Sequence, residues 1–328
     1  MELTFLRPEE VPVSLAALRA VASANGSVTS SEQTLLDLVA EMHGSKVDPE
    51  LPGVSPSEVA STITDPHRRK RLLQLAVVMA MVDGDVSPEQ QRAVRALARA
   101  LEIDDGSLSV LNDVANDSRL LTRVHLTRRL MGPFAREARE REGLAGVKKL
   151  LAPAFGGGED PAMAWRYKQL GLLPAGTVGR AFWEHNTRRG FSFPGEPNSI
   201  PERMVFHDFG HVLAGYDTDA PGEIQQGAFQ AGFVRNDGFS FLLFVIVQFH
   251  MGIKVTPVAE AQVGLFDVRK VLHAAARGAA CKMDLSTWNH WEWVERPLEE
   301  VREQFGIPPL LRFGRADTPG RGISGPAA

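Results

Sequence analysis

The sequence predicts an all-α protein built from two helical domains. Apolar residues recur at helical spacing in both halves of the chain, and Ser or Asp precedes several of these stretches, where a helix needs an N-terminal cap. No stretch of convincing length indicates a β-strand. We expect an N-terminal helical domain over 1–152, a linker over 153–161, a C-terminal helical domain over 162–312 and a disordered tail over 313–328.

The composition is that of a globular cytoplasmic protein. The 328 residues are 44% hydrophobic and the formal net charge is −4, so no global charge favours nucleic acid as a partner. The single cysteine, Cys281, excludes a disulfide framework and fits a reducing compartment. We see no signal or transit peptide, and the longest apolar run, Phe239 to Phe249, is too short to span a bilayer. A cytoplasmic protein is expected, soluble or peripheral on the inner face of the membrane.

The first domain contains an internal repeat. Asn25-Gly26-Ser27-Val28-Thr29 matches Asp83-Gly84-Asp85-Val86-Ser87, and each copy separates two apolar helical stretches. In the second copy Ser87 is the predicted N-cap, Pro88 lies in the first turn and Gln90 completes a capping box. In the first copy Ser30 and Gln33 are predicted to take these positions. Two helical hairpins are therefore expected to pack as one domain.

The segment AMVDGDVSPEQQRAVRALARAL of the second copy resembles the TerB-like (tellurite-resistance) helical domains. That resemblance implies an interaction or regulatory module. The acidic turn does not follow the calcium-loop pattern, because Pro88 stands at the sixth position and Val94 at the twelfth. We interpret it as a helix–helix turn whose acids suit a helix N-terminus, and the alternative is a weak divalent-metal site at Asp83, Asp85 and Glu89.

Residues 119–149 form a locally basic stretch, in which Gly132-Pro133 predicts a break between two helices. Arginines and lysines lie among leucines, a pattern that suits contact with an anionic membrane surface. Glu137, Glu140 and Glu142 interleave with the basic residues, as on an ordinary solvated helix, and this second interpretation is the favoured one.

The second domain is predicted to be helical throughout, after the Gly-rich linker PAFGGGEDP. Its expected helices cover 160–171, 177–189, 201–215, 221–251, 257–278 and 296–305. Residues 239–249 are apolar nearly all round, which is typical of the buried centre of a bundle. An alternative is that part of this surface lines a tunnel for a polyisoprenoid tail.

The segment MVFHDFGHVLAGYDTDAPGEIQQGAF, residues 204–229, is the candidate site. His207 and His211 are four residues apart, so on a helix both imidazoles lie on one face. Asp219 is a predicted N-cap for a second helix, whose first turn carries Glu223 back over that face. Such imidazoles and carboxylates suit a divalent ion, zinc first, with cobalt, manganese or iron(II) as alternatives. Asp208 faces about 100° away and either bends in as a ligand or orients an imidazole.

The sequence His207-Asp208-x-x-His211, eleven residues and then Glu223, resembles the metal motif of the Coq-four family of ubiquinone (coenzyme Q) biosynthesis proteins. Two flanking segments are similar to that family as well, WRYKQLGLLPAGTVGRAFWEHNTRRGFS (165–192) and WVERPLEEVREQFGI (293–307). The resemblance implies a helical bundle in which His207, Asp208, His211 and Glu223 are metal and catalytic residues. The fused TerB-like half departs from the family's usual single domain.

The resemblance also implies a function. The expected reaction is loss of the C1 carboxyl of a prenylated 4-hydroxybenzoate-type precursor, coupled to hydroxylation at that carbon. A polyprenyl quinone precursor or other isoprenoid lipid and other quinone-biosynthesis enzymes are the implied partners. Membrane-face attachment is also implied, and a homo-oligomer is left open.

Two other functions fit the same residues. A metal-dependent hydrolase would use the ion to activate water, but the further His and Asp ligands of the helical HD phosphohydrolases are not found at their spacings. A non-catalytic scaffold would hold a prenyl lipid in the second half and bind partners through the first. His250, Trp288, His290 and Trp291 are interpreted as structural.

Overall fold

The computed structural model describes residues 3–48, 53–152, 157, 159–256 and 259–311. Within these ranges it contains fourteen α-helices, short 3₁₀ turns and no strand, apart from two isolated bridges. The predicted all-α class is therefore confirmed. The predicted tail and most of the linker lie outside the described residues, and the domain division stays a prediction.

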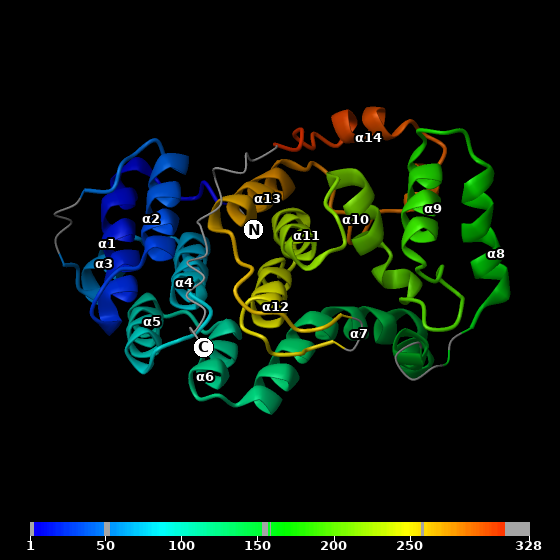
Figure 1. Ribbon diagram of the computed structural model, residues 1–328. Helices are drawn as coiled ribbons and strands as arrows, with labels where there is room; N and C mark the ends of the chain where they lie inside the picture. The colour runs from blue at the N-terminus through cyan, green and yellow to red at the C-terminus, as the bar shows by residue number, and fades with distance from the viewer. Residues whose placement is uncertain (1–2, 49–52, 153–156, 158, 257–258, 312–328) are drawn as a thin grey trace, which may run out of the picture.

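The first five helices form one end of the molecule (Figure 1). They are α1 (Val11–Ala22), α2 (Ser30–Met42), α3 (Pro56–Thr62), α4 (Pro66–Met81) and α5 (Pro88–Leu101). The predicted cap of α5 is confirmed, because the Ser87 side chain accepts from the Gln90 backbone N–H at 3.1 Å. The repeat pairs equivalent positions across the bundle: Gln90 donates to buried Glu32, 58 residues earlier, at 2.8 Å.

The predicted cap of α2 is wrong by one residue. Thr29 is the N-cap and Glu32 completes the capping box, in place of Ser30 and Gln33. Thr29 has the extended backbone that an N-cap requires, while Ser30 already belongs to the helix.

Helix α6 (Ser107–Ala115) leads into α7 (Arg119–Leu151), which runs beneath the centre of the molecule in Figure 1. The break predicted at Gly132-Pro133 is wrong, since the helix continues through Pro133 and its non-helical residue is Gly143, with φ 65°. Proline has a helical φ, so the chain can continue through it despite the lost N–H and the crowding of the preceding turn, whereas a positive φ is easiest for glycine.

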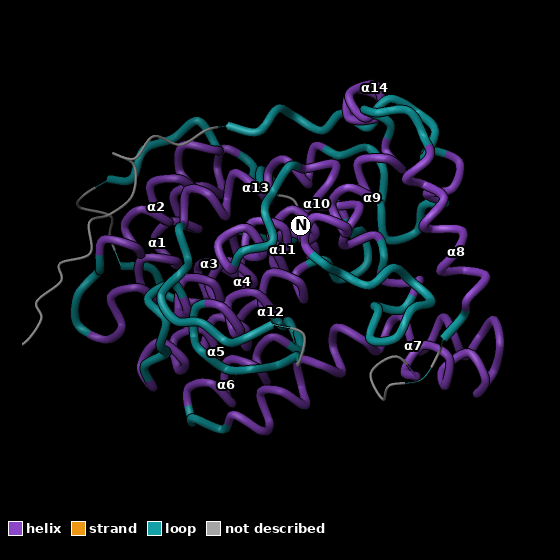
Figure 2. Tube along the Cα trace, turned by 45° about the vertical axis from the view of Figure 1, so that its right-hand side comes forward, coloured by secondary structure: helices purple, strands orange, loops and turns teal. Residues whose placement is uncertain are grey.

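The remaining helices are α8 (Pro161–Gln169), α9 (Val178–Arg189), α10 (Phe206–Ala214), α11 (Ala220–Phe233), α12 (Phe239–Phe249), α13 (Val268–Ala280) and α14 (Leu298–Gln304). The single helix predicted over 221–251 is wrong: it is two helices, separated at Asp237, which has φ 57°. The helix predicted over 257–278 begins only at Val268, where Asp267 caps it, and residues 257–258 lie outside the described chain. Figure 2 shows α11, α12 and α13 packed in the middle of the helical assembly.

The core of the second half depends on a close approach of α11 and α13. A Cβ on Gly278 would lie 2.0 Å from the Phe229 carbonyl oxygen, so only glycine fits this contact. Helix α12 is buried as predicted, and no helix in the described ranges has the length and apolarity needed to cross a membrane.

Polar contacts join the two halves, among them those of His250 and Arg129. His250, after α12, bonds the Val82 carbonyl oxygen through Nε2 at 2.9 Å. Arg129 of α7 contacts Asp105 at 2.6 Å and Asp237 at 2.7 Å, so it connects the first half to the α11–α12 turn.

Candidate metal centre

The two helices of the motif are held in place by local backbone chemistry. Helix α10 ends at Gly215, whose φ of 79° reverses the chain. The predicted cap of α11 forms, because the Asp219 side chain accepts from the Gly222 N–H at 2.9 Å. Gly210 lets the helices approach closely, since a Cβ there would lie 2.0 Å from Nε2 of Gln226. Glu223, in the first turn of α11, is thereby carried back over α10.

Three of the four predicted ligands meet at one point. Nε2 of His207 lies 3.2 Å from Nε2 of His211 and 3.4 Å from a carboxylate oxygen of Glu223. The second carboxylate oxygen lies 3.3 Å from Nε2 of His211. All three ligand atoms lie within 4.8 Å of one another, a spacing that one divalent ion can bridge.

Each imidazole is oriented from behind. Nδ1 of His207 lies 3.1 Å from Oε1 of Gln230, and Nδ1 of His211 lies 3.1 Å from the Tyr216 carbonyl oxygen. Both partners are acceptors, so each Nδ1 carries the proton and donates it. Nε2 is therefore the ring nitrogen that faces the shared point, and once it gives up any proton it offers its lone pair to a metal, as in metal-binding histidines.

The charges of the three residues reinforce one another. Burial alone would lower the pKa of His207, but the charge and hydrogen bond of Glu223 outweigh it and raise that pKa to about 9. Burial would raise the pKa of Glu223, but the two imidazoles hold it far below its usual range. A divalent cation can replace the proton of this imidazolium–carboxylate cluster.

The cluster opens on one side. The His211 side chain is 1% exposed, whereas His207 is 31% and Glu223 20% exposed. Catalytic zinc sites have this arrangement: three protein donors hold the ion, and one accessible side leaves a coordination position for water or substrate.

Asp208 is not part of this three-residue group. It lies close enough for the charges of both histidines and Glu223 to act on its pKa, which burial raises above its ordinary value. The charge of Asp208 also contributes to raising the pKa of the buried Tyr167 of α8. Its role as a ligand therefore stays a prediction.

His185 of α9 was not predicted from the sequence. Its ring centroid lies 5.5 Å from that of His211, and the side chain is buried at 8% exposure. Burial, followed by the charge of His211, lowers its pKa to about 3, so the ring is neutral. Its Nε2 is buried and has no hydrogen-bond partner among the described residues. An unpaired polar atom beside the cluster of His207, His211 and Glu223 is costly unless a bound group satisfies it. This favours a site that is occupied in the working protein.

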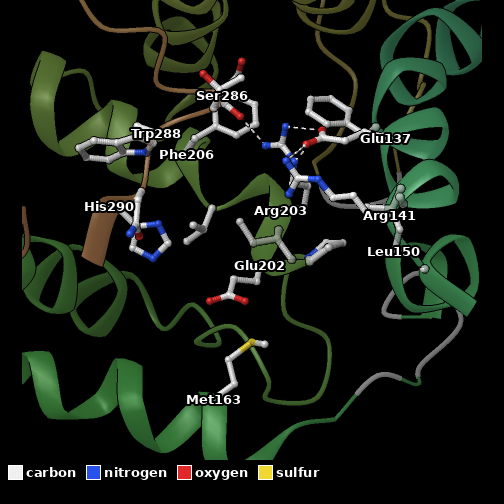
Figure 3. A pocket seen from close by; sticks show the side chains of 18 of the residues that line it. Glu137, Arg141, Leu150, Met163, Glu202, Arg203, Phe206, Ser286, Trp288 and His290 are labelled. Carbon is white, nitrogen blue, oxygen red and sulfur yellow. Dashed lines mark hydrogen bonds and ion pairs between the residues drawn. The ribbon is translucent and has the colours of Figure 1, made fainter. Parts of the chain in front are cut away.

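A cavity of about 540 Å³ lies beside the start of α10. Val205 and Phe206 line it, but none of the three clustered ligands does. Figure 3 shows Phe206, Trp288, Glu202 and Met163 around it, with Arg203 and Arg141 at one end. A smaller cavity of about 340 Å³ reaches Ser240 and Phe241 at the start of α12.

No protein-family model matches the chain, and no curated protein matches it. The chain is similar to a crystal structure from Nostoc punctiforme that is named, provisionally, a ubiquinone biosynthesis protein. The identity is 20%, the TM-score is 0.35, and the match covers 62% of this chain and 96% of that one. These values do not carry that protein's name over to this chain.

Proposed function

We propose that this protein is a divalent-metal-dependent enzyme of ubiquinone biosynthesis. It replaces the C1 carboxyl of a prenylated 4-hydroxybenzoate-type precursor by a hydroxyl group. The observation that carries the proposal is the convergence of His207, His211 and Glu223, with both Nε2 atoms directed at one point. The resemblance of this motif and its flanks to the Coq-four family supplies the substrate class.

The donor set fits zinc, and cobalt, manganese or iron(II) are alternatives. When bound, such an ion supplies positive charge that attracts a carboxylate or phenolate and stabilises charge building on the ring as carbon dioxide leaves. Gln230 and the Tyr216 carbonyl oxygen keep the two imidazoles oriented. Substrate reaches the site from the exposed side of His207 and Glu223.

The reaction is an oxidation and needs an oxidant. With dioxygen, the carboxylic acid, two electrons and two protons from a donor give the phenol, carbon dioxide and water. The tail of the substrate would hold the enzyme at a membrane. In support, Leu120, Leu121 and Val124 of α7 are exposed beside Arg123 and Arg128.

Turnover of a substrate labelled with ¹³C in the carboxyl group tests the proposal. We expect metal-loaded protein to release labelled carbon dioxide, and the His207→Ala and Glu223→Ala variants to lose this activity by at least about 100-fold. A matched pair, His290→Ala and Glu202→Ala, changes a histidine and a carboxylate beside the neighbouring cavity and should keep the activity.

Two other results would overturn the proposal. Tight binding of a prenyl lipid to metal-loaded wild type without any turnover would make the protein a scaffold. Release of phosphate from nucleotides, with no carbon dioxide from the labelled acid, would make it a hydrolase.

A further inference from the structure

The cavity of about 540 Å³ has its own chemistry, separate from the metal centre. Its walls come from the second half of α7, the start of α8, the segment before α10 and residues 285–291. Its volume is in the range of sites that hold a small organic molecule.

The cationic groups of this cavity are already paired. Arg203 contacts Glu137 at 2.6 Å and 3.1 Å and also donates to the Ser286 carbonyl oxygen. Arg141 contacts the other oxygen of Glu137 at 2.9 Å. Figure 3 shows both guanidinium groups drawn together at that carboxylate, at one end of the cavity. An anionic ligand would have to break these ion pairs to gain a partner.

The other end of the cavity presents acceptors. The Tyr167 hydroxyl donates to Oε1 of Glu202 at 3.2 Å and lies 2.8 Å from Nε2 of His290. A phenol has one proton, so Nε2 of His290 is the donor in the second bond and its Nδ1 is left as an acceptor. Burial lowers the pKa of His290 to about 4, which keeps the ring neutral. Glu202 points into the cavity with its second carboxylate oxygen unpaired in the described structure.

Apolar side chains surround this carboxylate. Phe206, Trp288 and Met163 line the space next to Glu202. A cation already occupies an aromatic face nearby, since the Arg166 guanidinium lies 3.6 Å from the Trp291 ring centroid. Aromatic faces and a carboxylate attract ammonium groups and repel anions.

We propose that this cavity binds a small organic cation, an ammonium group on an apolar or aromatic body. The ammonium group contacts Glu202 and the body packs against Phe206 and Trp288. This site goes beyond the proposed function, because the carboxylate substrate proposed for the metal centre would be repelled by Glu202.

Titration calorimetry with three matched probes tests the inference on the full chain. Phenylbutylamine, phenylbutyrate and phenylbutanol share one body and differ in charge. We expect the amine to bind at least about tenfold more tightly than the acid and the alcohol. Glu202→Gln should weaken amine binding about tenfold or more and leave the alcohol within about twofold. Glu142→Gln, at the exposed edge of the same cavity, is the matched control and should change neither.

Three results would each overturn the inference. They are equal affinity for acid and amine, no binding of the amine at millimolar concentration, and an unchanged amine affinity in Glu202→Gln. His207→Ala should retain amine binding, because His207 does not line the cavity. Failure of this site and failure of the metal centre are therefore distinguishable.

Discussion

At the scale of single residues, the metal centre depends on groups that no sequence spacing specifies. The spacing of His207 and His211 and the turn to Glu223 were enough to predict that these three side chains converge, and their role as metal ligands stays a prediction. The partners that fix the tautomers, Gln230 and the Tyr216 carbonyl, follow from how α11 packs on α10.

Gln230→Leu tests that orientation. Removing the acceptor of the His207 Nδ1–H frees the ring to rotate, and we expect the affinity for zinc to fall about 10- to 100-fold. Competition titration against a chromogenic chelator measures it. Gln225→Leu is the control, since among the described residues the Gln225 amide bonds the Pro221 carbonyl oxygen of its own helix and no part of the cluster. Equal zinc affinity of the two variants would exclude an orienting role for Gln230.

His185→Phe tests the role of the unpaired Nε2 of His185, which lies beside the cluster of His207, His211 and Glu223. If its Nε2 hydrogen-bonds the group bound to the metal, benzoate affinity for cobalt-loaded protein should fall about tenfold, with cobalt affinity unchanged within about threefold. The visible absorption bands of bound cobalt report both the cobalt affinity and the benzoate affinity. His185→Gln should restore part of the lost benzoate affinity. A collapse of cobalt affinity would instead make His185 a ligand.

His185 could not be predicted because its spacing from the motif has no helical or turn meaning. Only the packing of α9 against α10 brings it to His211. Asp208 illustrates the reverse case: it is adjacent in sequence to His207, yet its direction on the helix leaves it outside the cluster.

At the scale of helices, local chemistry was predictable and packing was not. The cap formed by Ser87 and Gln90 was predicted correctly because it involves only neighbouring residues. At α2 three consecutive hydroxyl residues, Thr29, Ser30 and Ser31, are candidate N-caps, and the sequence does not tell which has the extended backbone. The turn at Asp237 was missed although Arg235-Asn236-Asp237-Gly238 is a polar turn sequence, because apolar residues resume directly after it.

Gly278→Ala tests the contact that positions α11. The new Cβ would overlap the Phe229 carbonyl oxygen, a backbone atom, so α11 must move. We expect the free energy of unfolding to fall by about 2 kcal/mol, as measured by urea denaturation, and zinc affinity to fall with it. Gly53→Ala, where no atom of the described structure lies within 4 Å of the new Cβ, should stay within about 0.5 kcal/mol. A fully stable Gly278→Ala would contradict the close approach.

At the scale of the whole molecule, Arg129 connects the two halves through Asp105 and Asp237. The fold class was predicted correctly, but this bridge was not, since its members lie far apart in sequence. Burial would raise the pKa of Asp105, but the hydrogen bond and charge of Arg129 outweigh it and hold that pKa well below its usual range.

Asp105→Asn should therefore lower the free energy of unfolding by about 3 kcal/mol at neutral pH, because Asp105 is 3% and Arg129 10% exposed. A carboxylate with a depressed pKa stabilises the fold above its unfolded pKa of about 3.9, and this contribution is lost as the pH falls through the folded pKa. The difference between wild type and variant should be constant from pH 7 to about 5 and shrink below about pH 4.

Urea denaturation across this pH range is the measurement. Asp104→Asn, at an exposed neighbouring position, should change stability by less than about 0.5 kcal/mol. A difference that already disappears between pH 7 and 5 would contradict the assignment to Asp105.

The most direct test of the metal centre is elemental analysis of the purified protein. We expect about one divalent ion per chain in the wild type, and none in His207→Ala or Glu223→Ala. Glu202→Ala should keep the ion, since Glu202 lies outside the cluster. A wild type that binds no divalent ion after dialysis against zinc, or variants that keep it, would contradict the assignment of His207, His211 and Glu223 as its ligands.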